Sequence, residues 1–169
     1  MNGIRKGILK AEQSVQNFMK WVLFLVTGAM TVIVLLGVFF RYVLEAPLPW
    51  SEELARYLMV WGASLGAFVA FKEGSHVGVT IIMDRIQGQA AVALTRAAQF
   101  IVALFMAIVT IEGFILVSQI KGQTSAAMEI PMGWAYLAIP VGCLLILLEV
   151  LIMIFFKSDQ SIEKRGEAL

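Results

Sequence analysis

Residues 41–56 read RYVLEAPLPWSEELAR and separate two long apolar stretches of the chain. Pro47 and Pro49 prevent a helix from continuing through this segment and favour an extended backbone. Ser51 is a residue type that caps helix N-termini, and the two glutamates after it suit the positive end of a helix dipole. The segment therefore predicts a loop that ends at Ser51 and a helix that follows over residues 51–71.

The composition places the chain among membrane proteins. Of its 169 residues, 60% are hydrophobic and 15% are charged, and the mean hydropathy is +0.85. Soluble domains are about 45–50% apolar and about 25% charged. The net charge of +1 supplies no basic field for nucleic acid, so no nucleic-acid partner is expected.

Segments on both sides of residues 41–56 are long enough to cross a bilayer, which takes about 20 residues of helix. We expect an all-α integral membrane protein that forms a single domain over residues 1–169. Its transmembrane helices are predicted at residues 21–41, 51–71, 90–120 and 133–156.

The remaining segments predict structure at the membrane surface. Residues 3–18 place apolar side chains at helical spacing among lysines and arginines, which is typical of an amphipathic interfacial helix. Residues 76–88 predict a second interfacial segment, and residues 157–169 a polar tail. Lys72 and His76 are accordingly expected at the interface.

Lysines and arginines gather on one side of this topology. They are frequent before the first span, between the second and third spans, and in the tail, whereas the other side has only Arg41, Arg56 and Lys121. The positive-inside rule therefore predicts that both termini are cytoplasmic and that residues 41–56 lie outside.

Charged residues are also predicted inside the spans, namely Arg96, Glu112 and Glu149. A charge at that depth is costly unless it has a partner. The topology places Arg96 and Glu149 in the same half of the membrane, so a contact between these two side chains is expected.

The second span shows signs of a protein partner. Its small residues recur at a spacing that lets two helices approach closely in lipid. Glu52 and Arg56 lie four residues apart and could pair, and the short apolar part of the span draws both toward the membrane. We expect a buried contact with a partner subunit through Trp50, Glu52, Glu53, Arg56, Trp61, Gly62, Ala63, Gly66, Ala67 and Ala70.

No sequence motif supports an enzyme. The G-x-S-x-G pattern at residues 62–66 lies within an apolar helix, not on the strand–turn–helix elbow that such a nucleophile needs. The single histidine cannot supply paired haem ligands, and no H-E-x-x-H or Walker A pattern is present. We therefore expect no catalytic residue, no cofactor and no metal site.

An ordered set of residues carries a resemblance to one family. The set comprises Arg41-Tyr42, Trp50-Ser51-Glu52-Glu53, Arg56, Trp61, the small residues of the second span, and Lys72 with His76-Val77. It resembles the small, Q-type (DctQ-like) membrane subunit of tripartite ATP-independent periplasmic (TRAP) transporters. Many members have an aspartate shortly after the histidine, where this chain reads Gly78-Val79-Thr80; Asp84 could supply that contact.

The resemblance implies a role in the bacterial inner membrane. Such a subunit joins a large M-type subunit, which carries the solute and sodium sites, and a periplasmic protein delivers a carboxylate solute such as sialic acid or a C4-dicarboxylate. The small subunit would brace the large one, contact membrane lipid, and carry no solute site. Docking of the binding protein is expected at Arg41, Glu45 and Lys121.

Two alternatives stay open at this point. One is a stand-alone small four-helix exporter, although such exporters depend on an acidic residue in the first span and residues 21–40 have none. The other is an accessory subunit of a different membrane complex.

Overall fold

The computed structural model describes residues 2–73 and 89–154, with side chains at 13–73 and 93–154. Within these residues the regular elements are helices, and the β-type pairing is limited to an isolated antiparallel bridge between Thr124 and Pro131. Four segments are long and apolar enough to cross a membrane, which confirms the predicted fold class. The predictions for residues 76–88, for His76 and for residues 157–169 lie outside the described residues.

Helix α1 (Asn2–Tyr42) is continuous, and its candidate span covers Gln13–Tyr42. The helices predicted separately at residues 3–18 and 21–41 are therefore one helix. Lys20 does not interrupt it, because lysine has a high helix propensity. The membrane-surface position of the first part of α1 stays a prediction.

Helix α2 (Pro49–Lys72) begins two residues earlier than predicted. Leu48 is its N-cap residue in an extended conformation, and the prediction that Ser51 caps the helix is wrong. Proline suits the first helical position because its φ is preset and it lacks the N–H that would go unsatisfied there. The Ser51 hydroxyl instead donates to the Leu48 carbonyl oxygen at 2.8 Å.

Helix α4 (Gln89–Gln119) matches the third predicted span closely. The fourth span consists of a short helix α5 (Gly133–Tyr136) and a longer helix α6 (Ala138–Ile152). Pro140 has no N–H to offer the Tyr136 carbonyl, which accounts for the division at this point. The two pieces together form one candidate span, Gly133–Ile152.

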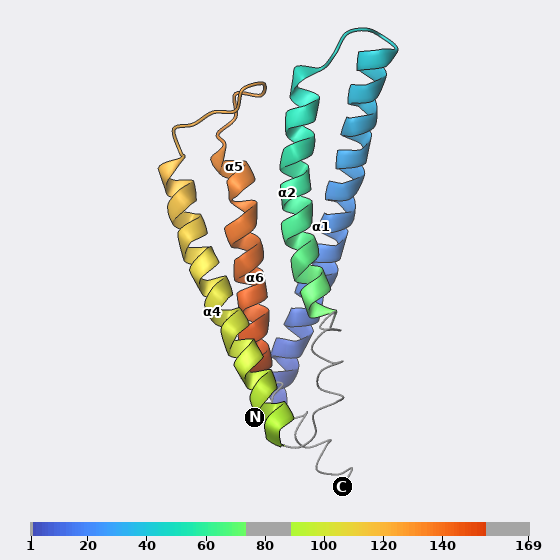
Figure 1. The fold of residues 1–169 in the computed structure, drawn as a ribbon. Helices are drawn as coiled ribbons and strands as arrows, with labels where there is room; N and C mark the ends of the chain where they lie inside the picture. The colour runs from blue at the N-terminus through green and yellow to red at the C-terminus, as the bar shows by residue number, and fades with distance from the viewer. Residues whose placement is uncertain (1, 74–88, 155–169) are drawn as a thin grey trace.

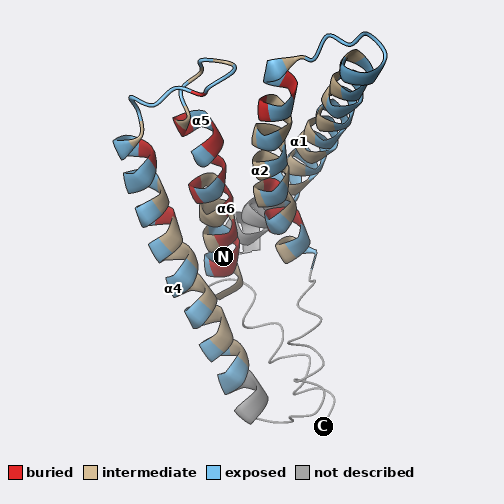
Figure 2. Cartoon of the chain, turned by 45° about the horizontal axis from the view of Figure 1, so that its top comes forward, coloured by how far each residue is buried: buried red, intermediate tan, exposed pale blue. Residues whose placement is uncertain are grey.

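The helices stand in a row in the order α1, α2, α6, α4 (Figure 1). Each packs mainly on its neighbour in the row, so the fold consists of two helical hairpins, α1–α2 and α4–α5–α6, joined between α2 and α6. Buried residues concentrate along this junction, whereas α1 and α4 are largely exposed (Figure 2). The core cluster contains Phe68, Val69, Ile146 and Val150.

Glycines permit close contact at each of the three junctions in the row. Such approaches matter in lipid because burial of apolar surface gives little driving force there. A Cβ atom added to the glycine would lie 2.8 Å from Ser51 Oγ at Gly37 (α1 on α2), 2.9 Å from Ser64 Cβ at Gly142 (α6 on α2), and 2.9 Å from Pro140 Cβ at Gly113 (α4 on α6).

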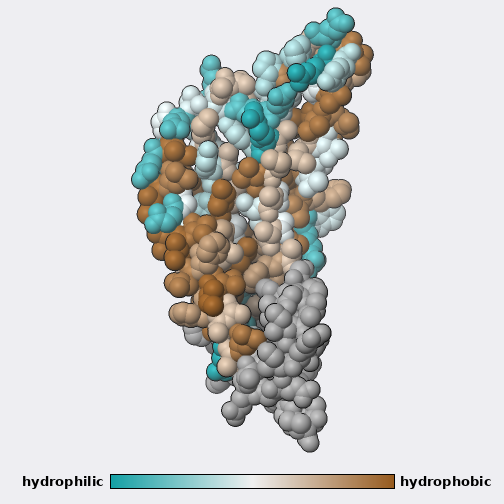
Figure 3. Space-filling model, in the orientation of Figure 1, coloured by the Kyte–Doolittle hydropathy of each residue, from teal (hydrophilic) through white to brown (hydrophobic). Residues whose placement is uncertain are grey.

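The two described connections, residues 43–48 and 120–132, lie at the same end of the row, which we call the loop end (Figure 1). Hydrophilic residues gather toward this end, and hydrophobic ones cover much of the helical surface below it (Figure 3). Polar connections at one end of an apolar row place the loop end in the aqueous phase.

Candidate interaction surfaces of the second helix

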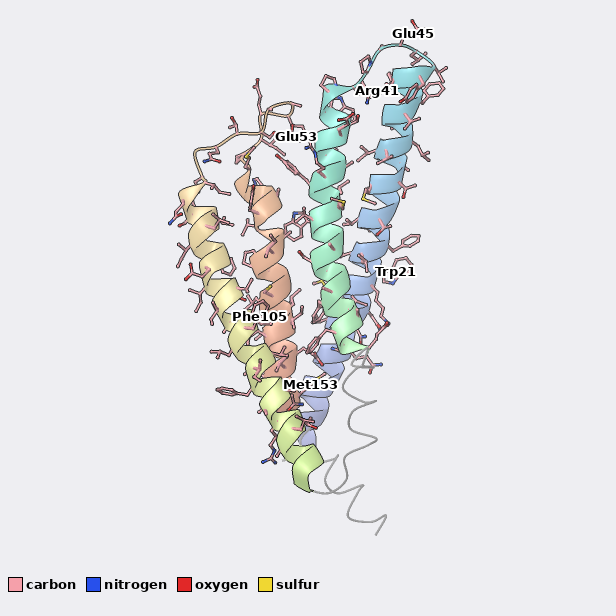
Figure 4. All side chains as sticks on the ribbon, in the orientation of Figure 1. Trp21, Arg41, Glu45, Glu53, Phe105 and Met153 are labelled. Carbon is pink, nitrogen blue, oxygen red and sulfur yellow. The ribbon has the colours of Figure 1, made fainter. Side chains whose placement is uncertain are left out.

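Glu53 holds a loop that belongs to the other hairpin. Its side chain is buried near the start of α2, at the loop end (Figure 4). Oε2 accepts the backbone N–H groups of Ala127 at 2.8 Å and Met128 at 3.2 Å. Oε1 accepts the Tyr57 hydroxyl at 2.7 Å. A buried carboxylate is stable when hydrogen-bond donors surround it in this way.

The loop that Glu53 holds is itself closed by backbone hydrogen bonds. The Ser125 N–H donates to the Ile130 carbonyl at 2.8 Å, and the Met132 N–H donates to the Gln123 carbonyl at 2.9 Å. We call residues 123–132 the clamped loop. Glu129 adopts a φ of 55°, a left-handed conformation that is uncommon for residues other than glycine.

Further contacts join α2 to the second hairpin below the loop. The Trp61 indole N–H donates to the Trp134 carbonyl oxygen at 3.1 Å. At the far end of α2, Lys72 Nζ lies 3.4 Å from Glu149 Oε2. Three contacts therefore join α2 to the second hairpin. Glu53 acts at the loop end, Trp61 between the two ends of α2, and Lys72 at the opposite end.

The pairing of Glu149 corrects one prediction. Glu149 was expected to contact Arg96, but its partner is Lys72, and both side chains of this pair are buried. Arg96 and Glu112 are exposed on α4. The sequence could have suggested the observed pair, because Lys72 ends the second span and Glu149 lies near the same end of the fourth.

The small residues of α2 divide between two directions. Gly62 and Gly66 face α1, since an added Cβ would lie 3.7 Å from Val26 and 3.9 Å from Leu23. With about 100° per residue, the exposed positions of α2 form a separate stripe that neither α1 nor α6 covers. This exposed stripe comprises Glu52, Arg56, Met59, Ala63, Ala67 and Ala70.

Four residues of the predicted partner interface also make contacts within the chain. These are Glu53, Trp61, Gly62 and Gly66, and their contact with a partner subunit stays a prediction. Sequence alone did not separate the two sets because both share helical spacing. Trp50 is 37% exposed at the start of α2 and stays available beside the exposed stripe.

The side-chain pair that Glu52 and Arg56 could have formed is absent from the described contacts. Glu52 Oε1 instead lies 2.9 Å from Arg41 Nη1 at the end of α1, and Arg56 Nε donates to the Glu52 backbone carbonyl at 3.3 Å. Gly37, one turn before Arg41, lies against Ser51, where α1 and α2 approach each other closely. The three residues line a groove of about 660 Å³ between the two helices.

The three residues predicted to dock a binding protein all lie at the loop end. Arg41 lies in the last turn of α1, Glu45 lies in the connection after it (Figure 4), and Lys121 follows α4. All three are exposed. Glu45 has a φ of 52°, which turns the chain sharply away from α1.

Four apolar helices, with no cluster of metal-binding side chains among the described residues, define a multi-pass membrane protein. The family profile described as "Tripartite ATP-independent periplasmic transporters, DctQ component" matches residues 30–158. The chain therefore belongs to the DctQ family of these transporters. The family is a transporter component of the inner membrane and not an enzyme, and it does not favour a stand-alone exporter.

Individual relatives agree with this assignment. A protein of Haemophilus influenzae described as a TRAP transporter small permease is 29% identical over 124 residues, or 72% of this chain and 75% of that protein. The C4-dicarboxylate TRAP transporter small permease protein DctQ of Rhodobacter capsulatus is 34% identical over 97 residues, 56% of this chain and 43% of that protein. The sialic acid TRAP transporter small permease protein SiaQ of Vibrio cholerae is 31% identical over 107 residues, covering 60% and 59%.

Proposed function

We propose that this chain is the scaffold subunit of a sodium-coupled, binding-protein-dependent importer of a carboxylate solute. Sialic acid and C4-dicarboxylates are the candidate solutes, since two relatives are named for them. Solute and sodium bind in a large M-type subunit. The distribution of lysine and arginine supports cytoplasmic termini and a periplasmic loop end.

The observation that carries this proposal is the exposed stripe of α2. It begins with Glu52 and Arg56 and continues as Met59 and three alanines inside a candidate span. Charged groups at the edge of lipid favour a protein partner, and alanines allow a helix of that partner to approach closely. The large subunit therefore packs along this stripe, with Trp50 at its edge.

The row of helices suits a static support. Contacts through Glu53, Trp61 and Lys72 hold the two hairpins together along the whole of α2. A transporter whose large subunit moves solute across the membrane needs a part that keeps its depth in lipid. This chain supplies that part with its exposed apolar surfaces on α1 and α4.

Reconstitution of separately purified components tests the proposal. Vesicles with this chain, the large subunit and the binding protein from the same operon are expected to accumulate solute when a sodium gradient is applied. Vesicles that lack any one component are expected to show none. Uptake by this chain alone, or uptake that is independent of sodium, would contradict the proposal.

A further inference from the structure

We propose that the outward side of α4 is a second contact with the large subunit, and that Glu112 pairs there with a lysine or arginine of a transmembrane helix. The inference rests on the proposed function, because that function supplies the large subunit. It adds a surface on the second hairpin, whereas the exposed stripe of α2 belongs to the first. It also assigns a role to a charge that no contact within the described residues uses.

Exposed side chains on α4 recur at alternating intervals of four and three residues. This is the spacing of the seam between two helices that cross with a left-handed supercoil, and most helices in membranes pack in this way. We call these residues the α4 seam. It comprises Ile101, Phe105, Ile108, Glu112, Ile115 and Gln119.

The second hairpin covers a different side of α4. An added Cβ atom at Gly113 would lie 2.9 Å from Pro140 Cβ, and one at Gly133 would lie 3.7 Å from the buried Val117. These contacts hold α4 against α5 and α6. Because α4 stands at the end of the row (Figure 1), the α4 seam stays exposed among the described residues.

Glu112 places a carboxylate in this otherwise apolar part of the seam. It lies within the candidate span Ala93–Gln119. It is seven residues before the end of α4, which is about 10 Å along the helix axis. Among residues 13–73 and 93–154, no lysine, arginine or histidine forms an ion pair with it. A charged side chain within a span is costly unless it meets a partner or water, so the exposed Glu112 calls for a partner from outside the chain.

The charge of Glu112 distinguishes between the possible neighbours of the α4 seam. Hydrocarbon offers a carboxylate neither a counter-ion nor a hydrogen-bond donor, and the glutamate side chain is shorter than the lysine and arginine side chains that reach the headgroups. A second copy packed on the same seam about a two-fold axis would bring two carboxylates together, and like charges at an interface are unfavourable. A basic residue on a helix of the large subunit supplies the opposite charge.

A polar residue in an apolar seam also fixes the register of the two helices. Glu112 therefore sets the depth at which the helix of the large subunit lies against α4, and the apolar members of the seam pack on either side of the ion pair. With the exposed stripe of α2, the large subunit then contacts both hairpins of this chain.

Chemical labelling measures whether Glu112 is covered in the complex. Dicyclohexylcarbodiimide is an uncharged reagent that modifies carboxyl groups in apolar surroundings. We expect it to modify Glu112 in nanodiscs that hold this chain alone, and to leave Glu112 unmodified in nanodiscs that hold the wild-type complex. Peptide mapping by mass spectrometry measures both. Glu149 is the internal control, since it is 3% exposed and should stay unmodified in both samples.

Substitutions at Glu112 measure the contribution of the ion pair to assembly. Glu112→Gln keeps the shape of the side chain and removes its charge, so the dissociation constant of the large subunit in detergent should rise about tenfold. Glu112→Lys should raise it further, because a lysine repels the basic partner. Arg96→Gln is the matched control, since Arg96 is exposed on α4 outside the seam. The isolated Glu112→Gln chain should unfold at the wild-type temperature, which separates lost assembly from lost folding.

Cross-linking identifies the neighbour of the seam. A photo-reactive amino acid at position 115, one turn from Glu112, is expected to label a transmembrane helix of the large subunit that contains a lysine or arginine near the labelled site.

Each other outcome overturns the inference. Equal labelling of Glu112 in the isolated chain and in the complex means that nothing covers the α4 seam. An unchanged dissociation constant in both variants means that Glu112 has no basic partner. Cross-links only to lipid or to a second copy of this chain assign the seam to another neighbour. Failure of the proposed function is distinguishable, because the wild-type chain would then form no complex with the large subunit or support no uptake before any variant is made.

Discussion

Lys72 Nζ lies 3.4 Å from Glu149 Oε2, and the two side chains are 6% and 3% exposed. The pair joins the last turn of α2 to α6 at the end opposite the clamped loop. Glu53 joins α2 to the second hairpin at the loop end. Helix α2 is therefore held to that hairpin by polar contacts at both of its ends.

Single substitutions in the buried Lys72–Glu149 pair are expected to lower the stability of the chain strongly. Lys72→Met or Glu149→Gln breaks the buried contact between these two side chains, and removal of one member of a buried ion pair costs about 3–5 kcal/mol. We expect each variant to lower the thermal unfolding temperature in detergent. The double variant Lys72→Met, Glu149→Leu should recover part of the loss, because it buries no lone charge.

The exposed pair between Lys20 and Glu73 is the control for that experiment. Its side chains are 45% and 48% exposed, so Glu73→Gln should cost about 0–1 kcal/mol. If Glu73→Gln and Glu149→Gln lowered the stability equally, burial of the Lys72–Glu149 pair would not increase its contribution to stability.

The glycine contacts predict a difference between two identical substitutions. An added Cβ at Gly142 would lie 2.9 Å from Ser64 Cβ and 3.0 Å from the Ser64 carbonyl oxygen. Gly142→Ala must push α6 away from α2, and overpacking of this kind costs about 1–3 kcal/mol.

Gly28→Ala is the control, because no atom lies within 4 Å of an added Cβ there. Alanine favours a helix over glycine by about 1 kcal/mol, so Gly28→Ala should be neutral or stabilising. Thermal unfolding of both variants in the same detergent measures the difference. A Gly142→Ala variant as stable as the wild type would contradict the close packing of α6 on α2.

Replacement of Trp61 is expected to have a modest effect on stability. Trp61→Phe keeps the aromatic ring but removes the N–H that donates to the Trp134 carbonyl, at a cost of about 0.5–1.5 kcal/mol. Trp21→Phe, at a 67% exposed position, serves as the control and should cost less. Chemical denaturation followed by circular dichroism measures both, and equal costs would remove Trp61 from the contacts that join the hairpins.

The substitution Glu45→Lys tests whether the binding protein docks at the connection between α1 and α2, residues 43–48. Glu45 is exposed and its φ is 52°, a conformation that lysine and glutamate adopt with similar strain, so the substitution changes the charge and little else. We expect a higher binding-protein concentration for half-maximal uptake and a smaller change in Glu45→Gln. An unchanged concentration in both variants would exclude Glu45 from docking.

Apolar patterning predicted the number and positions of the spans because length and hydrophobicity decide whether a helix crosses lipid. The prolines likewise predicted the break before α2. The start of α2 was placed too late because Ser51 was given the capping role, whereas Pro49 initiates the helix.

The side-chain contacts could not be predicted because they join residues far apart in the chain. Nothing in the local sequence says that Glu53 meets Ala127. The depth of Lys72 and Glu149 in their spans allowed their pair, but depth alone did not distinguish Lys72 from Arg96 as the partner of Glu149. The division of the small residues between α1 and the exposed stripe also depends on which side of α2 each neighbour occupies. These features follow from the order of the helices in the row.

The central claim is that the large subunit packs on the exposed stripe of α2. Ala63→Leu with Ala67→Leu adds bulk to that stripe at exposed positions, so the isolated chain should still fold. Ala29→Leu makes the same change at an exposed position within the α1 span and is the matched control.

The direct measurement is the amount of large subunit that co-purifies with each tagged variant from membranes. The account predicts that the Ala63→Leu, Ala67→Leu variant loses about nine-tenths of the large subunit, since a helix can no longer approach closely, while Ala29→Leu retains it. Full recovery of the large subunit by both variants would contradict the account.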